Sequence, residues 1–312
     1  MNIKIPFVTT WLGHDLVPFS CDYHMGHVGI SGQRGANLVV GNCDLLISLG
    51  SSISNSVTTT KPERFANNAV KVNFNIDPNE FTHTKDLFEH NIKLTASSAI
   101  EILEKMASRN NYKIQNDWYE FCKLSRLLSL NEKAPVSDHI HPFDIFRSLE
   151  LITPPNAVFA CDGGGTTVYS FLQAIRCRDN QRLIVVAGLG SMGSGIPEAI
   201  GLAQANKPIY LFCGDGSFPF NIQELQVVSD LKLPIIITVF SNNAYLSIRS
   251  TQDQFLEGRK IGSMPPDVHL LNIKKISSAF GVDYHYIESV TNYKDKINKW
   301  DEESFWNEII TM

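Results

Sequence analysis

Short apolar runs alternate with helical patterns along the chain. Residues 45–49 and 70–76 are apolar runs closed by Gly50 and by Asp77-Pro78, which predicts two buried parallel strands. Four further apolar runs each lead into a loop rich in glycine or asparagine: 157–161, 183–187, 209–213 and 235–240. The pattern is typical of parallel α/β sheets, in which such loops gather at the carboxyl edge, where ligands bind.

This alternation predicts the α/β class, with two open doubly wound parallel-sheet domains. We expect a first domain over residues 1–108, a connector over 109–141 and a second domain over 142–312. The connector contains one predicted helix that packs on a neighbour through its large side chains and a cysteine: Trp118, Phe121, Cys122, Leu124 and Leu128.

Composition narrows the class of protein. The 312 residues carry a formal charge of −5 without a basic stripe, which argues against a nucleic-acid surface. The longest apolar stretch, 183–203, is interrupted by several glycines and by Glu198, so we expect no membrane span. No signal peptide is visible and the six cysteines form no C-x-x-C pair. A cytoplasmic protein with free thiols is the expectation.

Two adjacent strand ends carry oxygen ligands. Asp215 lies between Gly214 and Gly216, where it can approach a metal, and the glycines leave backbone N–H groups open to phosphate oxygens. The pair Asn242-Asn243 ends the next strand and can reach the same ion. Carboxylate and amide oxygens suit Mg²⁺, which often bridges a protein carboxylate and a diphosphate. The alternative is a turn Asp and a turn Asn pair without a metal.

A second motif predicts a different ligand. Gly188-x-Gly190-x-x-Gly193 follows a strand and opens a helix, as a dinucleotide-binding fingerprint does. An NAD(P)-binding protein is therefore a further alternative. The second, Asn-rich loop argues against it, because a nicotinamide site does not need that loop.

The segment 142–259 resembles the diphosphate-binding domain of thiamine-diphosphate enzymes of the acetolactate synthase superfamily. The family motif is Gly-Asp-Gly, a spacer of nearly thirty residues and Asn-Asn, which matches Asp215 and Asn243. The first domain resembles the family's central domain through residues 6–11, 32–38 and 75–78. The resemblance covers most of the chain.

The resemblance implies a role for each site residue. Asp215, the Asn243 side chain and the Tyr245 carbonyl would hold Mg²⁺, and Met192 would be the apolar wedge that bends thiamine diphosphate. The remaining cofactor-binding positions are Gly165, Thr166, Gly190, Gly214, Gly216 and Ser217. The implied reaction is that of a transferase or lyase, in which a 2-oxo acid is decarboxylated and the remaining fragment passes to an acceptor.

The resemblance also implies a missing part. Family members begin with a pyrimidine-binding domain, whose glutamate assists deprotonation of the thiazolium carbon. Residue 1 here matches the inside of a truncated central domain, and residues 306–312 match the family's last strand. Glu63, Glu80 and Glu89 lie in polar stretches and do not replace that glutamate. No catalytic residue is identified, and we expect the isolated chain to be inactive.

Three functions therefore remain open. The first is an enzyme part that forms an oligomer, as a homodimer or with a pyrimidine-domain chain. The second is a non-catalytic remnant that binds the cofactor or nothing, and the third is the NAD(P)-binding protein. Some relatives bind FAD, and Arg34 and Asp77 match expected positions, but residues 50–56 lack the basic side chains of those members, which disfavours FAD.

Overall fold

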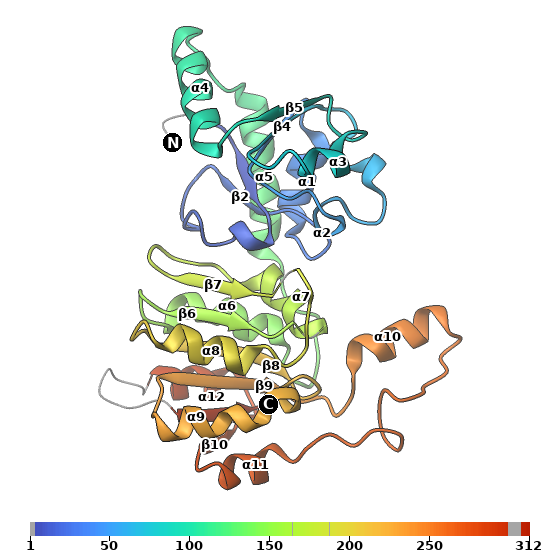
Figure 1. Cartoon of the computed structure of the whole chain (residues 1–312), viewed down its shortest axis with the longest axis vertical. Coiled ribbons are helices and arrows are strands. Elements are labelled where there is room, and N and C mark those ends of the chain that lie inside the picture. The colour runs from blue at the N-terminus through green and yellow to red at the C-terminus, as the bar shows by residue number, and fades with distance from the viewer. Residues whose placement is uncertain (1–3, 164, 187, 299–306) are drawn as a thin grey trace. The chain divides into compact units, whose positions relative to one another are not determined.

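A computed structural model describes residues 4–163, 165–186, 188–298 and 307–312 (Figure 1). The chain divides into two compact units, residues 1–132 and 133–312. That division falls inside the predicted connector. Every strand pairing among these residues is parallel, which confirms the predicted α/β class with parallel sheets.

The first unit contains two small sheets. Strands β1 and β2 pair with each other, and a three-stranded sheet has the order β3-β4-β5. Its elements are β1 (Phe7–Thr9), the 3₁₀ helix η1 (Trp11–Gly13), β2 (His24–His27), α1 (Arg34–Asn42), β3 (Leu45–Leu49), α2 (Asn55–Thr58), η2 (Pro62–Arg64), β4 (Val70–Asn75), α3 (Glu80–Thr84), β5 (His90–Lys93), α4 (Ala96–Arg109) and α5 (Asn116–Asn131).

Helix α5 is the helix predicted in the connector, and it packs along α1 within the first unit. Its buried face carries Cys122, Ser125 and Ser129, whereas Leu124 and Leu128 are 62% and 53% exposed. The prediction that both leucines pack on a neighbour is wrong for the described residues. A Cβ atom at Gly35 of α1 would lie 2.0 Å from the Ser125 carbonyl oxygen, so the helices meet through small residues.

Three buried histidines lie together at β2 of the first unit. The Thr9 hydroxyl is 3.2 Å from Nε2 of His24 and 3.2 Å from Nδ1 of His27. The rings of His14 and His27 stack, and the ring of His24 stacks on Phe7. Burial lowers the pKa of His24 to about 4, and the Arg126 guanidinium acts in the same direction. Burial also lowers the pKa of His27 well below its usual value.

The second unit is built on a six-stranded sheet with the order β10-β11-β9-β8-β6-β7. Its elements are α6 (Pro142–Ile152), β6 (Val158–Cys161), α7 (Gly165–Ala174), β7 (Arg182–Val185), α8 (Gly195–Ala203), β8 (Ile209–Gly214), η3 (Phe218–Glu224), α9 (Leu225–Asp230), β9 (Ile235–Phe240), α10 (Leu246–Phe255), α11 (Ile273–Ala279), β10 (Asp283–Tyr286), α12 (Val290–Asn298) and β11 (Asn307–Thr311).

Helices cover both faces of this sheet, so its central strands read as continuous apolar runs. On one face, α8, α9 and α11 pack on inward side chains of β6, β8 and β9. On the other face, Phe146 of α6 lies edge-on to Phe171, Phe212 and Phe240 at centroid distances of 5.1, 5.0 and 5.4 Å. All six residues of β9 are buried. This core fixes the strand ends that carry the site.

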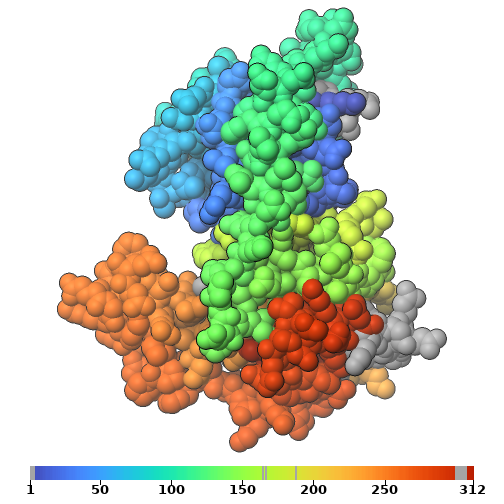
Figure 2. Space-filling view, turned by 180° about the vertical axis from the view of Figure 1, so that it is seen from behind, coloured from blue at the N-terminus to red at the C-terminus, as the bar shows by residue number. Residues whose placement is uncertain are grey.

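Helix α10 and the segment after it stand out from the rest of the second unit (Figures 1 and 2). Gln252 holds this arm together, since its Nε2 donates to the Ile261 carbonyl at 2.7 Å and its Oε1 accepts from the Ser263 hydroxyl at 2.7 Å. Tyr245 begins the arm, and its N–H donates to the Ser263 carbonyl at 2.8 Å. The arm is thereby tied to the loop that follows β9.

Among the described residues, no helix is both long and apolar enough to cross a membrane.

Candidate functional site

The predicted site lies at the carboxyl edge of the six-stranded sheet. The chain passes from β6 to β7 on one side, and β8 then pairs with the other side of β6. The strand order therefore reverses between β6 and β8, which is where ligands bind in open α/β sheets. Asp162 follows β6 and Asp215 follows β8, so each lies at this point.

One carboxylate oxygen of Asp215 is fully engaged. Oδ2 accepts hydrogen bonds from the Ser241 hydroxyl at 3.1 Å and from the N–H groups of Asn242 and Asn243 at 2.8 and 2.7 Å. These donors all belong to the loop after β9. The predicted association of the Gly-Asp-Gly loop with the Asn-Asn loop is therefore present as direct hydrogen bonds.

The second carboxylate oxygen of Asp215 differs from Oδ2 in its hydrogen bonding. Oδ1 is buried and has no hydrogen-bond partner among the described residues. Burial raises the pKa of the Asp215 carboxyl, and the hydrogen bonds that it accepts oppose this shift. A buried carboxylate oxygen without a partner is costly, and a bound cation would offset that cost. The residue therefore fits a divalent metal with oxygen ligands.

The other predicted metal ligands come from the same loop. Asn243 has a φ of 53°, a left-handed conformation that asparagine tolerates better than most residues. The described residues contain no group of three or more His, Cys, Asp or Glu side chains suited to a metal. A cation at Asp215 would therefore need amide and carbonyl oxygens, such as those of Asn243 and Tyr245, and oxygens of a ligand.

Gly216 brings the two loops into contact. A Cβ atom at this position would lie 2.7 Å from Cδ1 and Cε1 of the Tyr245 ring. Ser217 is buried, and its hydroxyl donates to the Gly214 carbonyl at 3.2 Å. The absence of a side chain at Gly216 thus allows the Asp215 loop to pack against Tyr245.

The loop after β6 packs against two other loops. Gly165 has a φ of 48°, and a Cβ atom there would lie 2.7 Å from Cβ of Ser247 at the start of α10. At Gly163 a Cβ atom would lie 2.5 Å from the Ser191 carbonyl oxygen. Gly164 and the side chain of Thr166 lie outside the described residues.

The glycine segment 188–193 is open on one side. A Cβ atom at Gly188 or Gly190 would meet no heavy atom within 4 Å, although Gly190 has a φ of 60°. The Met192 side chain is 39% exposed. This segment therefore has room beside it for a ligand.

Asp162 is a site residue that sequence reasoning missed. Its side chain is buried, and its Oδ1 and Oδ2 accept the Gly193 N–H at 2.9 and 3.0 Å. Burial raises the pKa of this carboxyl, and its hydrogen bonds oppose that shift. The available signal was an aspartate directly after a buried strand and before three glycines, the same context that identified Asp215.

Two family models match the chain. The model described as "Thiamine pyrophosphate enzyme, central domain" matches residues 1–104, and "Thiamine pyrophosphate enzyme, C-terminal TPP binding domain" matches residues 162–304. The chain belongs to the thiamine pyrophosphate enzyme family. This assignment favours the thiamine diphosphate interpretation over the dinucleotide-binding alternative.

Curated relatives of the chain are acetolactate synthase large subunits. The subunit of Lactococcus lactis subsp. lactis (strain IL1403) is 27% identical over 296 residues, which cover 94% of this chain and 50% of that protein. The isozyme 2 subunit of Escherichia coli (strain K12) is 28% identical over 286 residues, 91% of this chain and 50% of that protein. The subunit of Pyropia yezoensis is 30% identical over 303 residues, with 94% and 50% covered. The chain spans about half the length of these relatives.

The three glutamates considered as replacements for the missing glutamate lie in the first unit. Glu63 is exposed, and Glu80 is half-buried and accepts a hydrogen bond from the Ser52 hydroxyl at 2.9 Å. Glu89 is exposed, and its Oε2 accepts the Lys71 N–H at 2.7 Å.

The residues considered for FAD also lie in the first unit. Arg34 is exposed and pairs with Glu132 at 3.8 Å. Asp77 is exposed and accepts the Asn79 N–H at 2.9 Å. The expectation that the chain does not bind FAD stays a prediction.

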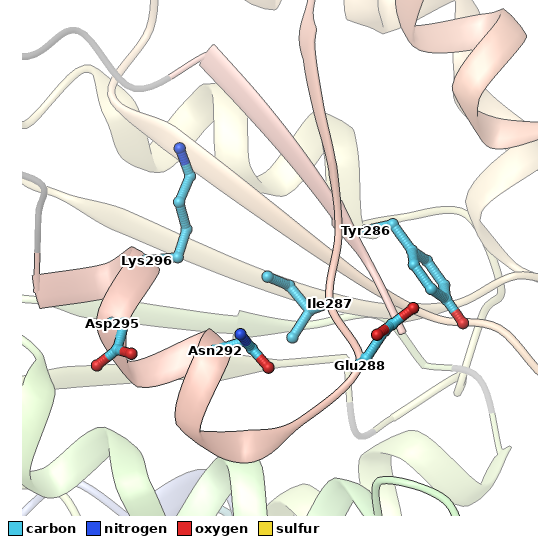
Figure 3. A pocket seen from close by; sticks show the side chains of 6 residues that line it. All are labelled: Tyr286, Ile287, Glu288, Asn292, Asp295 and Lys296. Carbon is cyan, nitrogen blue, oxygen red and sulfur yellow. The ribbon is translucent and has the colours of Figure 1, made fainter.

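A hollow of about 310 Å³ lies elsewhere in the second unit (Figure 3). It is lined by Tyr286 at the end of β10, by the segment that follows and by α12, from which Asn292, Asp295 and Lys296 come. The Lys296 ammonium is engaged with Glu308 at 3.1 Å. None of the predicted cofactor or metal residues lines this hollow.

Proposed function

We propose that the second unit binds thiamine diphosphate with Mg²⁺. Asp215, the Asn243 side chain and the Tyr245 carbonyl would hold the metal. The residues proposed to contact the cofactor are Gly165, Thr166, Gly190, Met192, Gly214, Gly216 and Ser217. The observation that carries the proposal is the buried Oδ1 of Asp215, which has no hydrogen-bond partner among the described residues and lies where the strand order reverses.

When bound, thiamine diphosphate supplies the acidic thiazolium carbon on which 2-oxo acids are decarboxylated. This chain's part is to hold the diphosphate end. The Asp215 loop supplies negative charge to the metal, and the glycines leave backbone N–H groups accessible to phosphate oxygens. Met192 offers an apolar side chain from the neighbouring segment.

We further propose that the chain works in a 2-oxo acid decarboxylase or carboligase. The group that activates the aminopyrimidine ring would come from a pyrimidine-binding domain, on a second chain or on a longer form of this one. We propose an oligomer, as a homodimer or with a pyrimidine-domain chain, because a domain on a second chain would complete the site. The chemical support is that the proposed metal ligands serve the diphosphate end, and the apolar Met192 side chain could not activate the aminopyrimidine ring.

Calorimetric titration tests the binding proposal. Thiamine diphosphate is expected to bind with one site per chain in the presence of Mg²⁺ and not after chelation of the metal. Binding of NADH without a metal would instead support the dinucleotide alternative, and no binding of either would contradict the proposal.

The catalytic proposal needs a second assay. Carbon dioxide release from a panel of 2-oxo acids would be measured for the chain alone and mixed with a pyrimidine-domain protein. We expect release only in the mixture, and only with cofactor. Cofactor binding without turnover in any mixture would contradict the catalytic proposal and support a non-catalytic binding protein.

A further inference from the structure

Gly193 is held on both sides by side chains from two different segments. Its N–H donates to both carboxylate oxygens of Asp162, which follows β6, at 2.9 and 3.0 Å. Its carbonyl oxygen accepts from Nδ2 of Asn221, which lies in η3 after β8, at 2.6 Å. The N–H and the carbonyl of Gly193 are therefore both bound by side chains from the segments that follow β6 and β8, the two strands between which the strand order reverses.

The backbone around this contact leaves little freedom. Gly193 has a φ of 87°, and a Cβ atom there would lie 2.3 Å from Cβ of Phe220. Asn221 interrupts η3 with a φ of −132° and a ψ of 40°. Gln223 Nε2 donates to Asn221 Oδ1 at 3.2 Å, which orients the amide so that its nitrogen faces Gly193. The kink at Asn221 and the orientation of its amide together direct Nδ2 to the Gly193 carbonyl.

Of the two contacts at Gly193, we expect the one with the Asp162 carboxylate to be the stronger. It is 2% exposed, and an ionised acceptor makes stronger hydrogen bonds than a neutral one. Beyond Gly193, its charged form is favoured by the N–H groups of Gly195 and Gly163. One buried carboxylate thus links the loop after β6 to the segment 188–193.

We propose that Asp162 and Asn221 are positioning residues that fix the segment 188–193 and with it Met192. This inference rests on the proposed function, in which Met192 meets the ring portion of thiamine diphosphate and the Asp215 loop holds the diphosphate. Neither positioning residue touches the cofactor. Their loss should weaken recognition of the rings and leave recognition of the metal-bound diphosphate unchanged.

The test compares two probes on the full chain: thiamine diphosphate with Mg²⁺, and inorganic diphosphate with Mg²⁺. We expect Asn221→Ala to weaken thiamine diphosphate binding on the order of tenfold, as one lost hydrogen bond permits, with diphosphate binding unchanged. Met192→Ala should show the same selectivity. Asp162→Asn, which retains an oxygen acceptor, should lose less affinity than Asp162→Ala.

Gln226→Ala is the matched control. Gln226 is exposed and lies in α9, the helix after η3, where its amide donates to Asp230 of the same helix at 2.8 Å. It should leave both affinities unchanged. Hydrogen exchange of the 188–193 segment without ligand should accelerate in Asn221→Ala and not in the control, while the melting temperature of both variants stays near that of the wild type.

The outcomes separate this inference from the proposed function. If the wild type binds both probes and Asn221→Ala binds them equally well, or loses both in equal measure, the positioning role is contradicted while cofactor binding stands. If the wild type binds neither probe, the proposed function fails and the positioning role fails with it.

Discussion

Asp215→Asn is expected to weaken the Mg²⁺-dependent binding of thiamine diphosphate strongly while leaving the fold intact. The asparagine oxygen can still accept from Ser241, Asn242 and Asn243, so the loop contacts persist. The charge at the buried Oδ1 position is lost, and Mg²⁺ depends on charged oxygen ligands. Substitution of residues that only support metal ligands lowers metal affinity roughly 10–100-fold. For the proposed ligand Asp215 we therefore expect cofactor affinity to fall about 100-fold or more in calorimetric titration.

Ser241→Ala is the matched control for this substitution. It removes one donor to Asp215 Oδ2 and leaves the charge, so the expected loss of affinity is at most about tenfold. Both variants should melt near the wild-type temperature. Wild-type affinity in Asp215→Asn, measured with the metal present, would show that Asp215 does not hold the ion.

The first unit is expected to lose stability as the pH falls below about 6.5, the ordinary value for histidine. The folded state lowers the pKa of His24 to about 4, through burial first and the Arg126 guanidinium second. The unfolded chain therefore takes up a proton at a higher pH than the folded unit does, so acid favours unfolding. Stability is fully present above about pH 6.5 and is lost progressively toward pH 4.

The shift at His24 corresponds to about 3 kcal/mol of unfolding free energy between these limits. Protonation of His27 acts with the same sign. Urea unfolding followed by hydrogen exchange of peptides from the first unit would measure the slope against pH. His24→Phe should flatten that slope, whereas His83→Asn, at an exposed position, should not. An unchanged slope in His24→Phe would contradict this account.

The central strands of the second unit were predictable because they are buried on both faces, as all six residues of β9 are. The apolar runs at 45–49 and 235–240 coincide with β3 and β9. The prediction that the first of these strands is buried is wrong, since Leu45 is 51% exposed and only Ser48 of β3 is buried. The run at 209–213 falls one residue short of β8, because Gly214 carries no apolar signal yet pairs with Phe240. Periodicity therefore located the edge of the sheet that carries the site.

Helix α5 shows where the pattern fails. Its leucines predict a packed face, but the close approach at Gly35 selects the face with Ser125. Side-chain size at a partner helix is not visible in the periodicity of α5 itself. Steric fit between elements far apart in sequence thus decided which face is buried.

The candidate site was predictable in part for a similar reason. Asp215 and Asn243 follow adjacent strands and match the spacing of a family motif, so the sequence predicts their association. The hydrogen bonds of Asp162 and Asn221 to Gly193 depend on the Gly193 φ of 87° and on the kink in η3. Both conformations arise only after the loops pack. Residues that support a site in this way can be identified only once the fold is known.

The central claim is that Asp215 holds a divalent ion together with a diphosphate ligand. Mn²⁺, which accepts the same oxygen ligands, can be followed by the electron paramagnetic resonance signal of the free ion. We predict that wild-type chain removes one equivalent of free Mn²⁺ only when thiamine diphosphate is present, and that Asp215→Asn does not. Equal Mn²⁺ binding by the wild type and Asp215→Asn, or none by the wild type with thiamine diphosphate present, would contradict the claim.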